Sequence, residues 1–276
     1  MPATLRAGTC NWNLLGGSSK QQWFLVFFCV VVLQFLILSN GTDHFLISFP
    51  VNGKFSENQL LVYNAVLDAQ IAVIEVMRPG VSWLEMHRTA ERAILSKLIE
   101  GGVLTKDAGS IEDMLDADLG AIFMPHGLGH LIGLDTHDVG GYTEGLTPKR
   151  SGRPGLSKLR TARTLEAEMV LTVEPGCYFI DILLDLALAN PAQSKFFNRD
   201  RLKEFRGTGG VRLEDDVVVT EDGCENLTIC PRAVSEVLDV MSGKAWPPSK
   251  DVLPELRRNW VRNDSGKLIQ YQLESS

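Results

Sequence analysis

The chain has 276 residues, of which 45% are hydrophobic and 22% charged, and its formal net charge is −7. This length is sufficient for a full core in one large domain or two small ones. The acidic balance excludes nucleic acid as the main partner, because no sustained basic face is available to neutralise phosphates. The short basic cluster RRNWVR at residues 257–262 is predicted to be a solvated tail.

The N-terminal stretch at residues 23–38 reads WFLVFFCVVVLQFLIL and contains one polar residue, Gln34. It is shorter than a membrane span, which needs about twenty apolar residues, and its length is typical of the core of a signal peptide. A buried strand, or a leader without a folded role, is the alternative. The five cysteines are scattered without paired spacing, which predicts a reducing, cytoplasmic setting. A membrane or secretory location through residues 23–38 stays open beside a cytoplasmic one.

An α/β pattern begins after Phe49. Capping residues and apolar spacing predict three helices: one from Ser56 to the stop at Pro79-Gly80, one from Ser82 to Gly101, and a short one from Ser110 to Leu115. Sequence rich in β-formers follows them. This order predicts helices packed on one face of a mainly antiparallel sheet.

Three histidines stand close together in MPHGLGHLIGLDTHDVGGY, residues 124–142. His126 and His130 are separated by Gly-Leu-Gly, which disfavours a helix. In an extended chain, residues four apart share a face, so both imidazoles are expected to point into one cleft. The glycines at 127 and 129 would let another backbone or a substrate approach closely. The alternative is a set of hydrogen-bonded histidines with no functional role.

Carboxylates recur in the two strongest strand patterns. Glu174 ends the apolar run EMVLTV, where a charge is costly to bury unless it is paired or bound to a metal. In GVRLEDDVVV, the residues Arg212, Glu214 and Asp216 alternate onto one face. A solvent-facing edge strand with a salt-bridged arginine would explain this pattern equally well. An imidazole with two carboxylates suits manganese, cobalt, iron or zinc.

Three blocks carry a family resemblance: MPHGLGHLIGLDTHDVGGY, LRTARTLEAEMVLTVEPGCYF and FRGTGGVRLEDDVVVT. In this order they resemble the Xaa-Pro dipeptidase (prolidase) branch of the pita-bread metallopeptidases, over about residues 48–242. The resemblance implies an α+β pita-bread catalytic domain, N-terminally truncated, that belongs to a homodimer. It also implies two metal ions, usually Mn²⁺, and hydrolysis of dipeptides with C-terminal proline or hydroxyproline.

The resemblance also implies roles for individual residues. The metal ligands are expected at His130, Glu174 and Glu214. The substrate-binding residues are expected to be His126, which lines the cleft, His137, which acts near the scissile bond as the catalytic residue, and Arg160, which holds the terminal carboxylate. An arginine that binds this carboxylate at a fixed distance would limit substrates to dipeptides.

The chain departs from the family at the two remaining ligands, which are aspartates in the family. Their positions here hold Leu33 and His44. Asp43 is adjacent, but a shift of one residue on a strand points a side chain to the opposite face. The family's upstream substrate-binding histidine and its N-terminal domain have no counterpart in this sequence. We therefore expect a hydrophobic leader unrelated to the family (1–40), a partial pita-bread domain (41–242) and a C-terminal tail (243–276) without a recognisable match.

Three functions follow from this departure. The first is a working dipeptidase in which His44, Asp43 or water completes a weakened site. The second is a catalytically inactive truncated isoform that acts as a folding or dimer partner. The third is a membrane-associated protein. We expect one weakly held metal ion and little activity, and we expect residues 24–38, rich in β-branched and aromatic side chains, to substitute for a missing strand.

Overall fold

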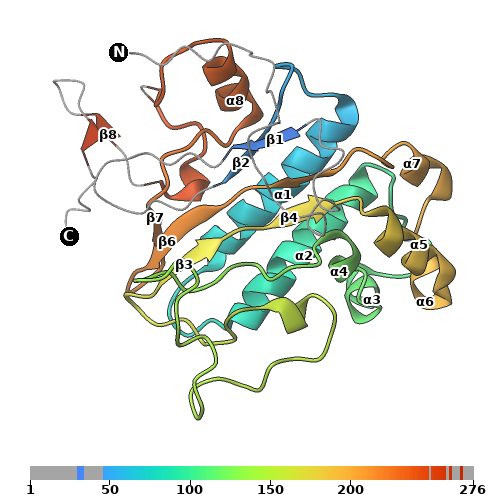
Figure 1. Cartoon of the computed structure of the whole chain (residues 1–276), viewed down its shortest axis with the longest axis horizontal. Helices are drawn as coiled ribbons and strands as arrows, with labels where there is room; N and C mark the ends of the chain where they lie inside the picture. Colours follow the sequence, from blue (N-terminus) through green and yellow to red (C-terminus); the bar gives the residue numbers. More distant parts are fainter. Residues whose placement is uncertain (1–29, 34–45, 249, 259–260, 263–267, 270–276) are drawn as a thin grey trace, which may run out of the picture.

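The computed structural model describes residues 30–33, 46–248, 250–258, 261–262 and 268–269 of the chain. Its elements in chain order (Figure 1) are β1 (Val30–Leu33), β2 (Ile47–Pro50), α1 (Glu57–Val76), α2 (Trp83–Glu100), α3 (Ile111–Asp116), α4 (Gly120–Phe123), the 3₁₀ turn η2 (Leu156–Lys158), β3 (Val170–Val173), β4 (Gly176–Tyr178), α5 (Asp181–Ala189), α6 (Pro191–Ser194), α7 (Arg199–Lys203), β5 (Gly210–Arg212), β6 (Asp215–Val219), β7 (Cys224–Asn226), α8 (Val234–Met241), the 3₁₀ turn η3 (Pro254–Leu256), β8 (Val261–Arg262) and β9 (Leu268–Ile269). All pairings between these strands are antiparallel. The α+β class is as expected.

Side-chain caps determine where the first three helices begin. The Ser56 hydroxyl accepts a hydrogen bond from the Gln59 amide nitrogen, and the Gln59 side chain accepts one from the Ser56 amide nitrogen. This reciprocal pair satisfies two backbone donors that have no partner within the helix. Ser82 caps α2 and Ser110 caps α3. Each side-chain oxygen accepts a hydrogen bond from a backbone amide in the first turn of its helix. The predicted starts of all three helices are confirmed.

Helices α1 and α2 pack side by side behind the strands, and Figure 1 shows them covering one face. Among the described residues, α1 is the one helix whose length and composition would suit a membrane span. Its buried side chains include Tyr63, Val66 and Ile74, each 0% exposed within the protein core. We therefore assign α1 as a core helix.

The β3–β6 pair and the β4–β5 pair follow the same register, although the strands are interrupted between the two pairs. β3 pairs with β6 so that Val173 lies opposite Asp215, and β4 pairs with β5 so that Gly176 lies opposite Arg212. Continuing either register through the break places Glu174 opposite Glu214. The long strand pattern predicted around each glutamate is thus two short strands, interrupted where the carboxylates lie.

β1 pairs antiparallel with β2, with Leu33 opposite Ile47. This strand occupies part of the segment, residues 24–38, that was expected to substitute for a missing strand. Its described partner is β2, and the strands that flank Glu174 and Glu214 are separate from it. Residues 1–29 and 34–45, which include the rest of the predicted leader, Asp43 and His44, lie outside the described residues.

The C-terminal segment corrects one expectation. Arg258, in the cluster predicted to be solvated, has a side chain that is 0% exposed and ion-paired with Glu236 and Asp251. Leu256 beside it is also 0% exposed. The prediction of a solvated cluster is wrong at Arg258, because the acidic partners that neutralise it come from α8 and from residue 251, and their approach is not visible in the local sequence.

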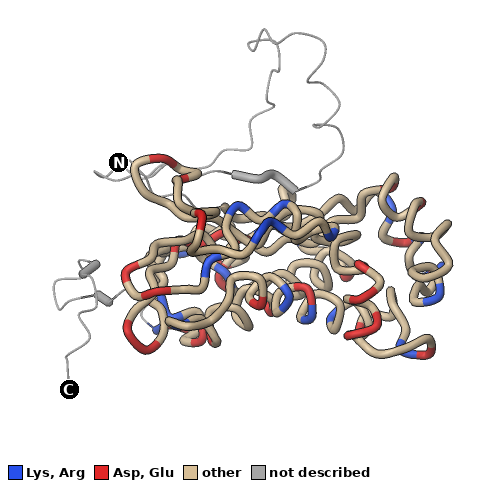
Figure 2. The backbone as a smooth tube through the Cα atoms, turned by 90° about the horizontal axis from the view of Figure 1, so that it is seen from below, with Lys and Arg blue, Asp and Glu red and all other residues tan. Residues whose placement is uncertain are grey.

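Charged residues of both signs are interspersed along the described backbone (Figure 2). Several form local pairs at the surface, such as Arg92 with Glu112 and Arg206 with Asp181. Exposed pairs of this kind each contribute less than about 1 kcal/mol. The packed apolar side chains between the helices and strands therefore carry most of the stability.

Candidate metal centre

Glu174 and Glu214 form the centre of the site because they face each other across neighbouring strands. Glu174 is 9% exposed and Glu214 is 6% exposed. Like charges directly opposite on two strands repel each other, and burial removes the water that would weaken this repulsion. A cation between the two carboxylates would turn this repulsion into attraction.

His130 completes a group of three. Ligand atoms of His130, Glu174 and Glu214 all lie within 4.8 Å of one another. The Nε2 atom of His130 is 3.4 Å from Oε1 of Glu174. Its other ring nitrogen, Nδ1, donates a hydrogen bond to the Leu131 carbonyl at 2.9 Å. This bond assigns the proton to Nδ1 and leaves the lone pair of Nε2 directed toward the carboxylates, as in metal-ligating histidines.

The pKa of the Glu174 carboxyl group is strongly raised. Burial, followed by the negative charge of Glu214, raises the pKa of Glu174 to about 8. The charges of Arg212 and Arg160 and a hydrogen bond from Thr172 oppose this rise. A second negative charge is therefore unfavourable in the metal-free site, so the carboxylate pair takes up a proton more readily than separate carboxylates do, and cation binding would displace that proton.

Arg212 is the cation that the structure places beside this pair. Its Nη1 atom lies 3.3 Å from Oε2 of Glu174, and its Nε donates to the Tyr178 hydroxyl at 2.9 Å. The salt-bridged arginine that was one reading of the sequence is present, but its partner is the buried Glu174. Tyr178 was not identified from the sequence, and its position at the end of β4, two residues after Gly176, is the available signal.

The glycines between the histidines allow close backbone contact. A Cβ on Gly129 would lie 1.9 Å from the Thr172 carbonyl oxygen, and one on Gly127 would lie 2.9 Å from the Leu159 Cα. The His130 amide donates to the Thr172 hydroxyl at 3.0 Å, and the Thr172 amide donates to the His130 carbonyl at 2.9 Å. The expected close approach of another backbone is confirmed, and it fixes His130 beside β3.

His126 lies behind this contact, next to β4. Its Nδ1 donates to the Gly127 carbonyl at 2.8 Å, and its ring packs edge-on against Tyr178 at 5.4 Å. Nε2 is buried and has no hydrogen-bond partner among the described residues. Burial, followed by the charge of Arg212, lowers the pKa of His126 to about 3, so the imidazole is neutral at physiological pH.

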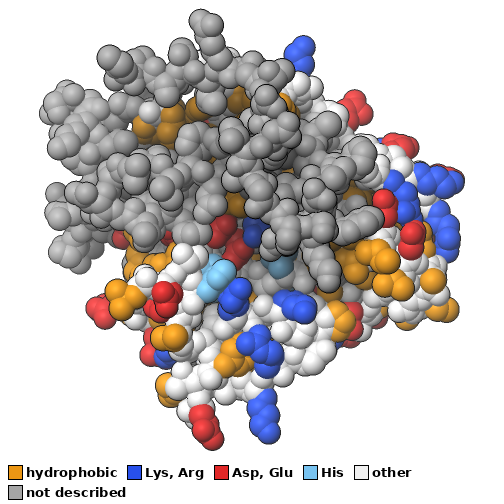
Figure 3. Space-filling view, in the orientation of Figure 1, with side chains coloured by type: hydrophobic (Ala, Val, Ile, Leu, Met, Phe, Trp, Pro, Cys, Tyr) orange, Lys and Arg blue, Asp and Glu red, His pale blue; other side chains and the backbone are white. Residues whose placement is uncertain are grey.

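His137 and Arg160 stand at the exposed rim of the centre. The His137 ring lies 4.4 Å from the His130 ring, centroid to centroid. Arg160 is exposed, and its charge acts on Glu174. The loop after His137 and the loop that carries Arg160 meet at Gly141. A Cβ on Gly141 would lie 2.1 Å from the Arg160 carbonyl oxygen. Histidine, acidic and basic side chains gather in one area of the face shown in Figure 3.

Comparison with known proteins identifies the family. Residues 41–221 match metallopeptidase family M24. The chain is 56% identical to the human Xaa-Pro dipeptidase over 203 residues. This matched region covers 73% of this chain and 40% of that protein. The chain is 37% identical over 194 residues to a probable Xaa-Pro aminopeptidase of Phaeosphaeria nodorum, covering 70% of this chain and 40% of that protein.

The chain belongs to metallopeptidase family M24.

Solved structures agree with this M24 assignment. Pseudomonas aeruginosa aminopeptidase PepP superposes with a TM-score of 0.55 at 34% identity, covering 73% of this chain and 38% of that one. Zinc-substituted Escherichia coli aminopeptidase P, in complex with product, gives a TM-score of 0.54 at 32% identity, covering 74% of this chain and 39% of that one. The fold is thus the pita-bread fold of the M24 enzymes. The chain spans about two fifths of the length of the relatives it matches.

The donor set of this M24 chain fits one divalent cation. Ligand distances of about 2.0–2.2 Å require ligand atoms no more than about 4.4 Å apart, so three atoms within 4.8 Å of one another need only small side-chain shifts to close on one ion. At one of the two family positions that would complete a second ion, Leu33 has no donor atom. The other, position 44, lies outside the described residues. Within the described residues, His130, Glu174 and Glu214 are the one group of three or more potential ligands.

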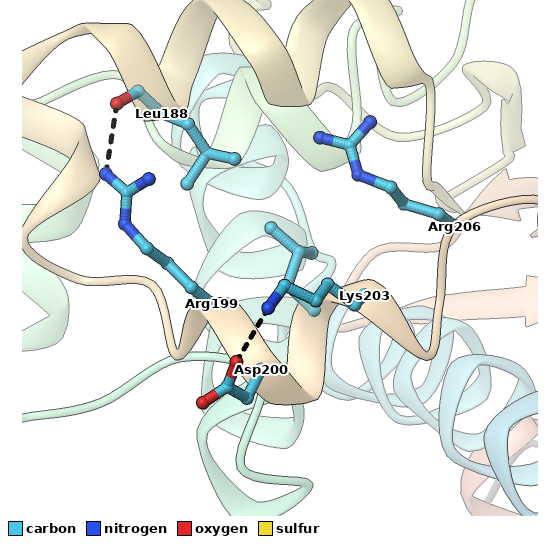
Figure 4. Close-up of a pocket in the computed structure, with 6 residues that line it drawn as sticks. Leu188, Arg199, Asp200, Lys203 and Arg206 are labelled. Atoms are coloured by element: carbon cyan, nitrogen blue, oxygen red, sulfur yellow. Dashed lines mark hydrogen bonds and ion pairs between the residues drawn. The ribbon is translucent and has the colours of Figure 1, made fainter.

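A pocket of about 440 Å³ lies away from this centre, between α5 and α7 (Figure 4). Three basic residues line it, and two of them are held in ion pairs. Lys203 pairs with Asp200, and Arg206 with Asp181. Arg199 donates to the Leu188 carbonyl at 3.4 Å. With these pairs in place, the pocket offers no strong positive potential to an anion, and we assign it no function.

Proposed function

We propose that this chain binds a single divalent cation, Mn²⁺ by family resemblance, and hydrolyses Xaa-Pro dipeptides at a reduced rate. The observation that carries this proposal is the pair of buried carboxylates, Glu174 and Glu214, facing each other beside the Nε2 lone pair of His130. Such a pair is unfavourable without a cation and favourable with one. A divalent cation here would polarise the amide carbonyl and activate a water molecule for attack.

The surrounding residues supply the remaining roles in this proposal. Arg160 binds the terminal carboxylate of the dipeptide at the exposed rim, where a charge-assisted pair forms readily. His137 lies beside His130 and donates or accepts a hydrogen bond near the scissile bond. His126 is neutral and forms the inner wall of the cleft next to Tyr178. A proline nitrogen fits this site because no N–H has to be accommodated there.

The rate is reduced because the second half of the ligand set is incomplete. Leu33 replaces one family aspartate, and the imidazole of His44 cannot supply the charge of the other. In a two-ion centre, the ions together stabilise the attacking and leaving groups. One ion held by three side chains supplies part of that charge.

Metal content and hydrolysis of Gly-Pro with added Mn²⁺ test the proposal together. We expect one ion per chain by elemental analysis after gel filtration, and slow turnover. Glu214→Gln should lose the ion, since it removes one of the three ligands. Retention of the ion by Glu214→Gln, or two tightly held ions in the unaltered chain, would contradict the proposed site. One bound ion without hydrolysis would favour an inactive partner role.

Restoring the family ligands provides a gain-of-function test. The double variant Leu33→Asp/His44→Asp should raise the metal content from one ion to two and accelerate Gly-Pro hydrolysis. Each single variant is the matched control, because it adds one ligand of the two. Equal metal content in all four proteins would show that these positions do not face the centre.

We also propose a cytoplasmic homodimer, on the basis of cysteine usage and the family resemblance. Sedimentation equilibrium should give twice the chain mass. Fractionation with carbonate extraction should leave the chain in the supernatant, whereas retention in the pellet would support the membrane alternative through residues 23–38.

A further inference from the structure

Arg232 lies behind the metal centre with its guanidinium inside the core. Its side chain is 1% exposed, and that of its partner Asp215 is 0% exposed. Both Nε and Nη2 of Arg232 donate to Oδ1 of Asp215, the first at 2.9 Å. The other oxygen of Asp215 accepts from Asn226 Nδ2 at 2.7 Å. The buried pair is thus fully hydrogen-bonded, which is the condition under which such a pair is tolerated.

The same guanidinium also contacts the backbone that carries Glu214. Nη2 donates to the Glu214 carbonyl at 2.6 Å, and Nη1 donates to the Leu46 carbonyl at 3.1 Å. These two carbonyls belong to residues that bond each other: the Glu214 amide donates to the Leu46 carbonyl at 2.9 Å, and the Leu46 amide to the Glu214 carbonyl at 3.3 Å. One side chain therefore holds both sides of this backbone bridge.

The bridge is short, so it needs this support. Leu46 and Glu214 form an isolated pair outside the named strands, in the interval between β5 and β6. A single pair constrains rotation of the backbone less than a continuous ladder does. A metal ligand must nevertheless be held to within about 0.5 Å of its working position.

We infer that Arg232 is a positioning residue for the cation site: it locks the Leu46–Glu214 bridge so that the Glu214 carboxylate faces Glu174. This inference rests on the proposed function, in which Glu214 is a ligand. Partners of this kind, one shell behind the metal, typically change metal affinity about 10–100-fold when they are altered.

The planar fork of arginine is essential to this role. It presents five N–H donors in fixed directions, whereas the lysine ammonium is a compact charge on a flexible chain. Arg232→Lys therefore keeps a positive charge near Asp215, but three donors on a single nitrogen cannot reproduce the four hydrogen bonds of the guanidinium. Arg258→Lys is the matched control. Arg258 is equally buried, with a side chain 0% exposed, and it pairs with Glu236 and Asp251.

Co²⁺ titration followed by visible absorption tests the inference, with urea unfolding of each protein as a measure of stability. We expect Arg232→Lys to weaken Co²⁺ binding about 10–100-fold, while Arg258→Lys stays close to the unaltered protein although both variants lose stability. Unchanged affinity in Arg232→Lys, or an equal loss in both variants, would overturn the positioning role.

Hydrogen exchange in EDTA separates this inference from the proposed function. In Arg232→Lys, the Glu214 amide should exchange about fivefold faster or more, the equivalent of one lost hydrogen bond, and no such increase should occur in Arg258→Lys. Equal exchange in the two variants would overturn the positioning role even if Co²⁺ binds. An unaltered protein that binds no Co²⁺ would overturn the proposed function, and the exchange result would still decide the role of Arg232.

Discussion

At the scale of single residues, the site combines groups whose charge is unfavourable in the metal-free protein. Glu174 has a pKa of about 8 and His126 a pKa of about 3, both because burial disfavours the charged form. Shifted pKa values of this kind are common at functional sites. Both shifts show that buried charge is unfavourable in the metal-free protein, and a cation would offset the charge of the Glu174–Glu214 pair.

His126 gives a testable pH dependence. Its pKa in the folded protein, about 3, lies below the ordinary value of 6.5. Between these values the unfolded chain binds a proton that the folded protein does not, so the free energy of unfolding falls as pH is lowered from 6.5 toward 3. His126→Gln removes this titration. Urea unfolding at pH 7.5 and pH 5 should show a decline smaller by about 2 kcal/mol in the variant; parallel profiles would contradict this.

At the scale of elements, the two strand pairs do more than carry the two glutamates. Their shared register places Glu174 and Glu214 opposite each other, and the interruption at both residues frees the side chains from the pleat of a continuous sheet. The segment with His130 then lies against β3 through Gly129. The centre therefore depends on backbone packing between three segments that are far apart in the sequence.

Gly129→Ala tests this packing. The added Cβ would lie 1.9 Å from the Thr172 carbonyl oxygen, a contact that forces the His130 segment away from β3. We expect the variant to lose about 1–3 kcal/mol of stability and to bind Mn²⁺ more weakly. Gly152→Ala is the control, because a Cβ there meets nothing within 4 Å. Equal thermal midpoints for the two variants would argue against the close contact.

At the scale of the whole molecule, the described residues 250–258 belong to the folded unit. Arg258 is bound by Glu236 of α8, and the Glu236 carboxylate also accepts hydrogen bonds from the amides of Arg232 and Ala233. Leu256 fills the core next to this network. Contacts from this segment therefore reach the backbone amides of residues 232 and 233, whereas the Arg232 guanidinium that holds Glu214 makes a separate set of contacts.

Leu256→Ala tests whether this segment contributes to stability. Removing a side chain that is 0% exposed should lower the free energy of unfolding by about 2–5 kcal/mol. Glu255→Ala, on the exposed side of the same 3₁₀ turn, should change it by less than about 0.5 kcal/mol. The measurement is urea unfolding of both variants. Equal midpoints would show that the segment does not pack as described.

By itself, the sequence determined the helix starts, the strand-forming runs and the candidate ligands, because caps, apolar spacing and a charge at the end of an apolar run are local signals. Only the tertiary structure decided that Glu174 and Glu214 face each other, that Arg212 pairs with Glu174, and that Arg232 and Arg258 are buried. These facts depend on register and on partners distant along the chain. The physical reason is that a local pattern shows which side chains are costly to bury, whereas packing decides which group neutralises them.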